Sequence, residues 1–131
     1  MPNATGTFEI ISASDDAFHE SENGPKLTRA SGTQRFSGEI EGDGSVEWLM
    51  CYLPDRSATF VGLQRIDGAV GGRKGSFVIQ AVGVHDGEQS KASWSIVAGS
   101  GTGELAGIRG EGSFHAPGGA DASYNLEYRL D

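Results

Sequence analysis

The sequence predicts an all-β protein, a closed eight-stranded antiparallel barrel formed by a single domain over residues 1–131. Apolar and polar residues alternate with a period of two, and no segment carries a long helical stripe. Twelve of the 21 glycines fall between Gly68 and Gly112, interleaved with strand-like runs, which is typical of a sheet that bends sharply. The connections are too short for parallel crossovers, so neighbouring strands are expected to be antiparallel.

The first half of the chain begins with an expected strand over residues 4–12. The polar segment from Ser14 to Lys26, broken at Asn23-Gly24-Pro25, is expected to be a long loop, either a lid or a mobile connection. A second strand over 27–40, irregular at Gly32, leads to a tight turn through Gly42-Asp43-Gly44.

The remaining strands are expected at 45–53, 58–67, 76–85, 90–98, 109–115 and 123–130. Pro54 ends the first of these. Residues 99–107 allow at most one helical turn, at Glu104-Leu105-Ala106. Closure of the sheet removes exposed strand edges, so a barrel is the economical arrangement, and a β-sandwich is the runner-up.

Two of the expected strands distribute their apolar residues differently between their two faces, and they therefore predict different burial. The last strand separates cleanly into an apolar face and a polar face that meets solvent. The strand over 45–53 is apolar on both faces. One face fits the barrel interior, and the other, formed by Leu49, Cys51 and Leu53, is expected to contact another subunit or a long loop folded over the wall. We favour a homo-oligomer.

Charge and composition exclude several partners. The net charge is −8 and no cluster of Lys or Arg stands out, so we expect neither nucleic acid nor an anionic membrane as a partner. The sequence starts without a basic segment or an apolar signal region, and its longest apolar run is Trp48 to Leu53. A single cysteine, Cys51, cannot form an internal disulfide. We therefore expect a soluble, cytoplasmic protein.

The motifs give little support for a cofactor or a nucleophile. The glycines at 99–103 lack the helix and acidic residue of a dinucleotide loop, and Gly71 to Ser76 has the residue types of a phosphate loop in the wrong order. Cys51 lies in an apolar run that disfavours a thiolate. His19, His85 and His115 show no paired ligand spacing. No metal and no organic cofactor are expected.

Three segments carry a family resemblance: LTRASGTQRFSGEIEG, ATFVGLQRIDGAVGGRKGSFVIQ and GSGTGELAGIRGEGSF. They resemble an uncharacterised bacterial family of small proteins grouped with the allene-oxide-cyclase-like β-barrels. The similarity spans nearly the whole chain and is most specific at 72–77 and 100–105. The resemblance implies an eight-stranded barrel and no established reaction.

Relatives at the level of fold are allene oxide cyclases, dirigent proteins and certain polyketide cyclases. They take a reactive apolar substrate into the barrel, generally without a cofactor, and by analogy imply the same here. Two positions depart from the family pattern. Gln64 stands where family members carry Glu before Arg65, and Ala81 follows Gln80 where they carry His. If that Glu and His form a proton-transfer pair in the relatives, that chemistry is missing here, and either the site is repurposed or the two residues are structural in the relatives.

The predicted site is a cavity inside the barrel, mostly apolar with a few polar groups that orient a carbonyl or hydroxyl. The alternatives are aromatic side chains that only fill a solid core, glutamines that point outward, and an arginine in a surface ion pair. The candidate residues are Trp48, Met50, Tyr52, Phe60, Tyr124 and Tyr128 for bulk, and Gln64, Gln80, Arg29 and the tyrosine hydroxyls for polar contacts.

Three hypotheses follow. The first is a cofactor-free cyclase or isomerase that orients a polyketide- or lipid-like substrate. The second is a non-catalytic binder of a small apolar molecule. The third is an assembly protein with a solid barrel. A filled interior would exclude the first two, and a roomy interior with an ionisable side chain would favour catalysis, which we place narrowly ahead.

Overall fold

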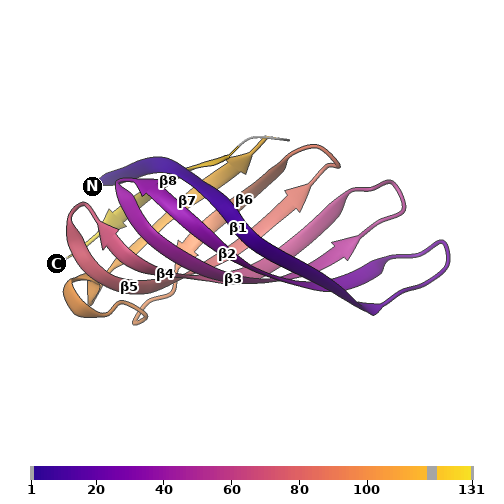
Figure 1. Ribbon diagram of the computed structural model, residues 1–131, viewed down its shortest axis with the longest axis horizontal. Helices are drawn as coiled ribbons and strands as arrows, with labels where there is room; N and C mark the ends of the chain where they lie inside the picture. Colours follow the sequence, from indigo (N-terminus) through magenta and orange to yellow (C-terminus); the bar gives the residue numbers. More distant parts are fainter. Residues whose placement is uncertain (1, 118–120, 131) are drawn as a thin grey trace.

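The computed structural model describes residues 2–117 and 121–130 and forms a closed antiparallel barrel of eight strands (Figure 1). Each strand pairs with the next in sequence, and β1 pairs with β8. The predicted fold class is confirmed, and the sandwich alternative is not adopted. The strands are β1 (Asn3–His19), β2 (Lys26–Gly38), β3 (Ile40–Tyr52), β4 (Ala58–Val70), β5 (Arg73–His85), β6 (Ser90–Ile96), β7 (Arg109–Ala116) and β8 (Ala122–Arg129).

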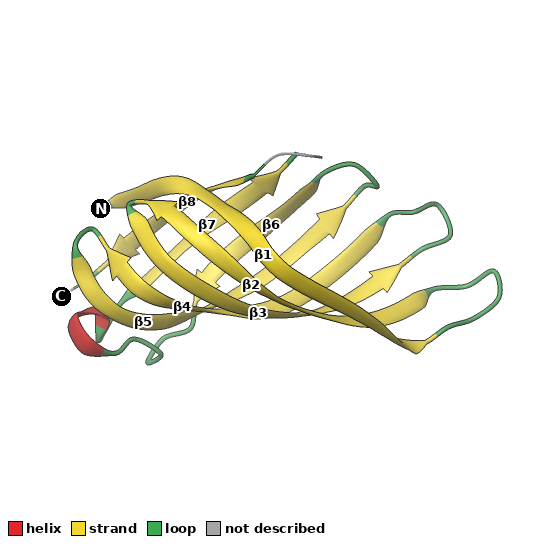
Figure 2. Ribbon diagram, in the orientation of Figure 1, coloured by secondary structure: helices red, strands yellow, loops and turns green. Residues whose placement is uncertain are grey.

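One end of the barrel is closed by the connection between β6 and β7. This connection contains η1 (Gly103–Leu105), a single 3-10 turn that packs against β5 and is drawn in red in Figure 2. Leu105 and Ile108 are fully buried there. The backbone N–H of Thr102 donates to the carbonyl of Ser76, so the connection covers the part of β5 that β6 leaves unpaired. The expected helical turn is confirmed within one residue.

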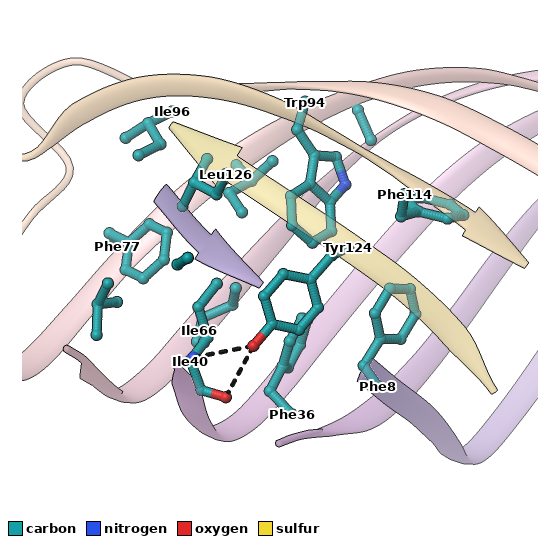
Figure 3. Packing of buried hydrophobic residues seen from close by; sticks show 14 of the residues in the cluster. Phe8, Phe36, Ile40, Ile66, Phe77, Trp94, Ile96, Phe114, Tyr124 and Leu126 are labelled. Carbon is teal, nitrogen blue, oxygen red and sulfur yellow. Dashed lines mark hydrogen bonds between the residues drawn. The ribbon is translucent and has the colours of Figure 1, made fainter. Parts of the chain in front are cut away.

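Aromatic rings fill the barrel above this closed end (Figure 3). Trp94 stacks on Tyr124 with 5.9 Å between ring centroids, and Phe8 packs against Phe36 at 5.0 Å. Phe114 meets the edge of Phe8 at 5.3 Å. Side chains of this size contribute the largest share of burial in a small core. The rings therefore make this half of the barrel solid.

Interior glycines make room for the rings. An added Cβ at Gly62 would lie 2.5 Å from Cδ1 of Trp48, and one at Gly6 would lie 2.5 Å from the hydroxyl oxygen of Tyr124. These distances are far inside van der Waals contact, so a larger residue would displace the ring. Large and small side chains thus alternate around the inner wall, as a small barrel requires.

A second set of glycines allows the sheet to bend. Gly42, Gly68 and Gly75 are neighbours across β3, β4 and β5. An added Cβ at Gly68 would lie 2.0 Å from the carbonyl oxygen of Glu41 on the adjacent strand. β3 and β4 approach here more closely than any side chain permits, and an added Cβ at Gly75 would lie 2.0 Å from the carbonyl oxygen of Thr102 in the connection between β6 and β7. This close packing is the geometry of a barrel corner.

The expected loop over Ser14 to Lys26 is wrong. β1 continues to His19 and pairs with β2 as far as Leu27, so the connection is only the turn over 20–25. Pairing with β2 satisfies the backbone of this segment, and because its side chains are exposed the strand needs no apolar alternation. Beyond Phe8, β1 no longer pairs with β8, and the β1–β2 hairpin projects past the other strands (Figure 1).

Two smaller expectations are also wrong. Gly42-Asp43-Gly44 lies inside β3, and the turn between β2 and β3 instead follows Gly38, which has φ +103°. The glycines suggested a turn because a turn and a bent strand use the same residue type. Gly32 pairs regularly with Ala13 and Val46, and the irregularity lies in β1 between Ile10 and Ser12, opposite Thr33 and Gln34.

Replacing Tyr124 by Phe tests the packing of the filled half. The Tyr124 hydroxyl accepts the buried N–H of Ile40 at 2.9 Å and donates to the Ser37 carbonyl at 2.9 Å. Tyr124→Phe leaves the Ile40 N–H without a partner, so the free energy of unfolding should fall by about 1–3 kcal/mol in urea denaturation. Tyr128→Phe is the matched control, because no hydrogen bond of the Tyr128 hydroxyl is found among the described residues. Equal losses in both variants would contradict this role.

Candidate functional site

A cavity opens at the end of the barrel opposite η1. Its volume is about 520 Å³, and it lies between the base of the β1–β2 hairpin and the inner faces of β3, β4 and β7. Most of its wall is apolar. The wall residues that point into the barrel include Phe8, Ala30, Trp48, Met50, Phe60 and Phe114.

A larger hollow of about 660 Å³ lies on the outer wall near the base of the hairpin. It is bordered by outward hydroxyl side chains such as Ser31, Thr33 and Ser45. We favour the inner cavity as the site despite its smaller volume, because aromatic side chains of the interior surround it and can remove a ligand from water.

The rim of the inner cavity carries the polar groups. Tyr52 from the end of β3 donates its hydroxyl hydrogen to Asp15 Oδ2 on the hairpin at 3.2 Å. Both residues line the cavity, together with Ser90 and Asp121. Burial, and next the nearby Asp15 carboxylate, raise the pKa of Tyr52 above 10.0. The phenol therefore stays protonated at neutral pH and is a proton donor at the cavity wall.

The Ser90 hydroxyl is within hydrogen-bond distance of His85 Nδ1, at 2.8 Å. The ring of the neighbouring His115 contacts Gln89 Oε1 through Nε2 at 2.6 Å. These contacts join the β5–β6 turn to β7. Among the described residues, no three His, Cys, Asp or Glu side chains are placed to hold a metal ion.

Four of the nine residues predicted from the sequence meet at this cavity: Trp48, Met50, Tyr52 and Phe60. Tyr124 and Tyr128 instead belong to the filled half, where Tyr124 is buried and Tyr128 packs against the core. The alternation in β8 identified their inward face correctly, but not their level along the barrel axis.

The two predicted glutamines and the predicted arginine lie outside the cavity, whereas Tyr52 lies in its lining. Gln64 is fully buried, and its side-chain N–H donates to Gln34 Oε1 at 2.9 Å inside the core. Gln80 is exposed on the outer face of β5, and Arg29 forms an ion pair with Glu47 on the outside of β2 and β3. Gln80 and Arg29 follow the alternatives stated for them, an outward amide and a surface ion pair.

Residues of β1 were missed as candidates. The sequence predicts that Phe8 lies in a strand but does not identify it as a site residue. The pattern of one strand does not show at which height along the barrel axis its side chains contact those of other strands. Asp15 was assigned to a loop, so no face was predicted for it. Its spacing from Phe8 gives no signal either, because the irregularity between Ile10 and Ser12 changes the alternation along β1.

The outer face of β3 is uncovered in the single chain. Leu49 is 52% exposed and Leu53 is 44% exposed, while Cys51 is half-buried. No loop folds over them among the described residues. The contact with another subunit that this face predicts stays a prediction.

The fold and the cavity define a small antiparallel barrel that is solid at one end and hollow at the other. The chain belongs to the DUF3224 family, described as proteins of unknown function, whose model matches residues 4–128. It is similar to a solved structure from Shewanella oneidensis MR-1, a DUF3224 protein of unknown function, with 26% identity and a TM-score of 0.79. The match covers 100% of this chain and 98% of the other.

No curated protein matches the sequence. In the described part of the chain, no helix has the length and apolar character needed to cross a membrane.

The environment of Tyr52 predicts a distinct alkaline titration. Its midpoint should lie above 10.0, because burial and the Asp15 charge both oppose formation of the phenolate. Asp15→Asn should lower the midpoint without restoring the ordinary value, since burial is the larger cause. Tyrosine Cζ chemical shifts measured by NMR against pH give the midpoint, and Tyr52→Phe assigns the signal. A midpoint unchanged by Asp15→Asn would show that the contact with Asp15 is absent in solution.

Proposed function

We propose that this protein binds a small apolar molecule in the open half of its barrel. The observation that carries the proposal is the division of the interior, with ring-on-ring packing at one end and a cavity of about 520 Å³ at the other. A solid interior would leave no room for a ligand. A volume of this size falls within the range of small-molecule sites.

The chemistry of the wall supports a ligand with an apolar body and one polar end. Trp48, Phe60 and Phe114 provide the surface that an apolar ring or chain would cover. At the rim, Asp15, Tyr52 and Ser90 provide hydrogen-bonding oxygens. The polar end of the ligand would therefore sit at the mouth, where water still reaches it, and the apolar body would point toward Phe8 and Phe114. This arrangement satisfies the polar group without burying it unpaired.

The resemblance to allene-oxide-cyclase-like barrels is part of this proposal and extends it to a substrate class. A polyketide- or lipid-like molecule has the apolar bulk that the wall accommodates. The match with a DUF3224 protein of unknown function supports the fold and carries no reaction.

Binding is tested with a neutral naphthylamine dye whose fluorescence rises in apolar surroundings. Ala30 lines the cavity, so Ala30→Trp should fill part of it and weaken dye binding by about tenfold or more. Ser123→Trp is the matched control, because Ser123 is the exposed neighbour of the cavity residue Ala122 and lies on β8, away from the apolar outer face of β3 to β5. Far-UV circular dichroism checks that both variants fold. Equal binding in wild type and Ala30→Trp would place the dye elsewhere and overturn the proposal.

Catalysis is the second candidate function, and the contact between Tyr52 and Asp15 favours it. The Asp15 carboxylate can take a hydrogen from the carbon next to a bound carbonyl while the Tyr52 phenol donates a proton to the carbonyl oxygen, and the C–H electron pair then forms the enol double bond that a cofactor-free isomerase or cyclase needs. The ligand would be held by the apolar wall, and the barrel would exclude water from its reacting carbon.

A hydrophobic ketone such as 2-tetralone tests this second function. The wild-type protein in D₂O should accelerate exchange of the hydrogens next to its carbonyl, as followed by NMR, and Tyr52→Phe should lose about 10²-fold or more of the acceleration. Dye binding by Tyr52→Phe should persist, which separates loss of catalysis from loss of the site. No acceleration by a wild-type protein that binds the ketone would contradict catalysis and leave the binding function standing.

A further inference from the structure

The outer face of β3, β4 and β5 carries a continuous apolar patch. Its members are half-exposed, between 44% and 53%, although each is a large aliphatic side chain. They come from three adjacent strands, and strand register places Leu49, Val61 and Val82 side by side in one row. The patch consists of Leu49, Leu53, Val61, Leu63, Val82 and Val84.

The size of the patch distinguishes it from scattered surface leucines. Six side chains of this kind together expose roughly 500 Å², which is near the upper limit for the largest patch of a monomeric protein. A stable two-fold contact needs about 800 Å² from each partner. The patch with its polar border, which includes Gln80 and Thr59, approaches that area.

The charges around the patch favour a second copy of this chain as the occupant. The net charge is −8, so two copies repel each other over most of their surface. The patch itself holds no charged side chain. At its border Arg29 is paired with Glu47, and Arg65 lies 3.7 Å from Asp67. Lys91 of β6 lies beside Val84 and has no ion-pair partner among the described residues. One positive charge at one side of the border is too little to oppose a copy of the same face or to attract a strongly charged partner.

We propose that the protein forms a two-fold homodimer in which the β3–β5 patch of one chain covers the same patch of its partner. Val61 lies at the centre, between Leu49 and Val82, so a two-fold contact over the patch brings the two Val61 side chains near each other. The dimer does not depend on the proposed ligand. It does involve the same strands, because Trp48, Met50 and Phe60, which line the cavity, alternate along β3 and β4 with patch residues.

The mass of the protein in solution tests the dimer. Light scattering after size-exclusion chromatography at micromolar concentration should give twice the chain mass for wild type. Val61→Arg and Val61→Glu should each be monomeric, because two like charges would meet at the centre of the contact. Asn125→Glu is the control and should remain dimeric, since Asn125 is exposed on β8, outside the patch.

Mixing the two charged variants tests the placement of Val61. An equimolar mixture of Val61→Arg and Val61→Glu chains should recover the dimer mass, because opposite charges then meet. Circular dichroism of each variant checks that the barrel is folded. A wild type that stays monomeric, or a dimer that persists in both single variants, would overturn the proposal. A mixture that stays monomeric beside a dimeric wild type would overturn the central position of Val61.

Discussion

The packing of Trp94 against Tyr124, Phe36 and Phe8 is the contact on which the rest of the molecule depends. These rings occupy one half of the interior and set the distance between opposite walls. The Tyr124 hydroxyl binds the backbone of Ser37 and Ile40, so the same cluster fixes the turn between β2 and β3. Since the strands continue beyond the rings, the remaining interior has walls of fixed spacing and smaller contents. The cavity therefore begins where the cluster of large aromatic side chains ends along the barrel axis.

The two-residue period of the strands separates the chemical roles of neighbouring residues. Along β4, Phe60 points inward and Val61 outward, so one strand contributes to a cavity and to an apolar outer face. Because contacts on the two faces share a backbone, they need no long path to influence each other. A small barrel has only one layer of sheet, so a chain with a modest core presents both an inner cavity and an outer apolar face.

The sequence predicts the barrel well because strand number, antiparallel order and inward faces follow from local alternation and turn residues. It predicts the wall residues Trp48, Met50, Tyr52 and Phe60 for the same reason, since they share the inner face of two neighbouring strands. The prediction fails where the register between strands determines which side chains meet in the interior. Tyr124 faces inward as expected but lies at the level of the filled half. Gln64 pairs with a glutamine 30 residues away, a contact that no local pattern specifies. The hairpin extension of β1 was hidden because an exposed strand and a polar loop have similar composition.

The pairing of β1 with β8 joins Asn3 to Glu127, near the two ends of the sequence. Every other strand pair in the barrel joins neighbours in sequence, so its hydrogen bonds can form one after another from the connecting turn. The closing pair has no such turn, so it carries the highest entropic cost of all contacts in the sheet. During synthesis on the ribosome, the early strands must wait as an open sheet, with the edge of β1 unprotected, until β8 emerges. Closure of the barrel therefore cannot precede the emergence of β8, and the interior is enclosed only once β1 and β8 have paired.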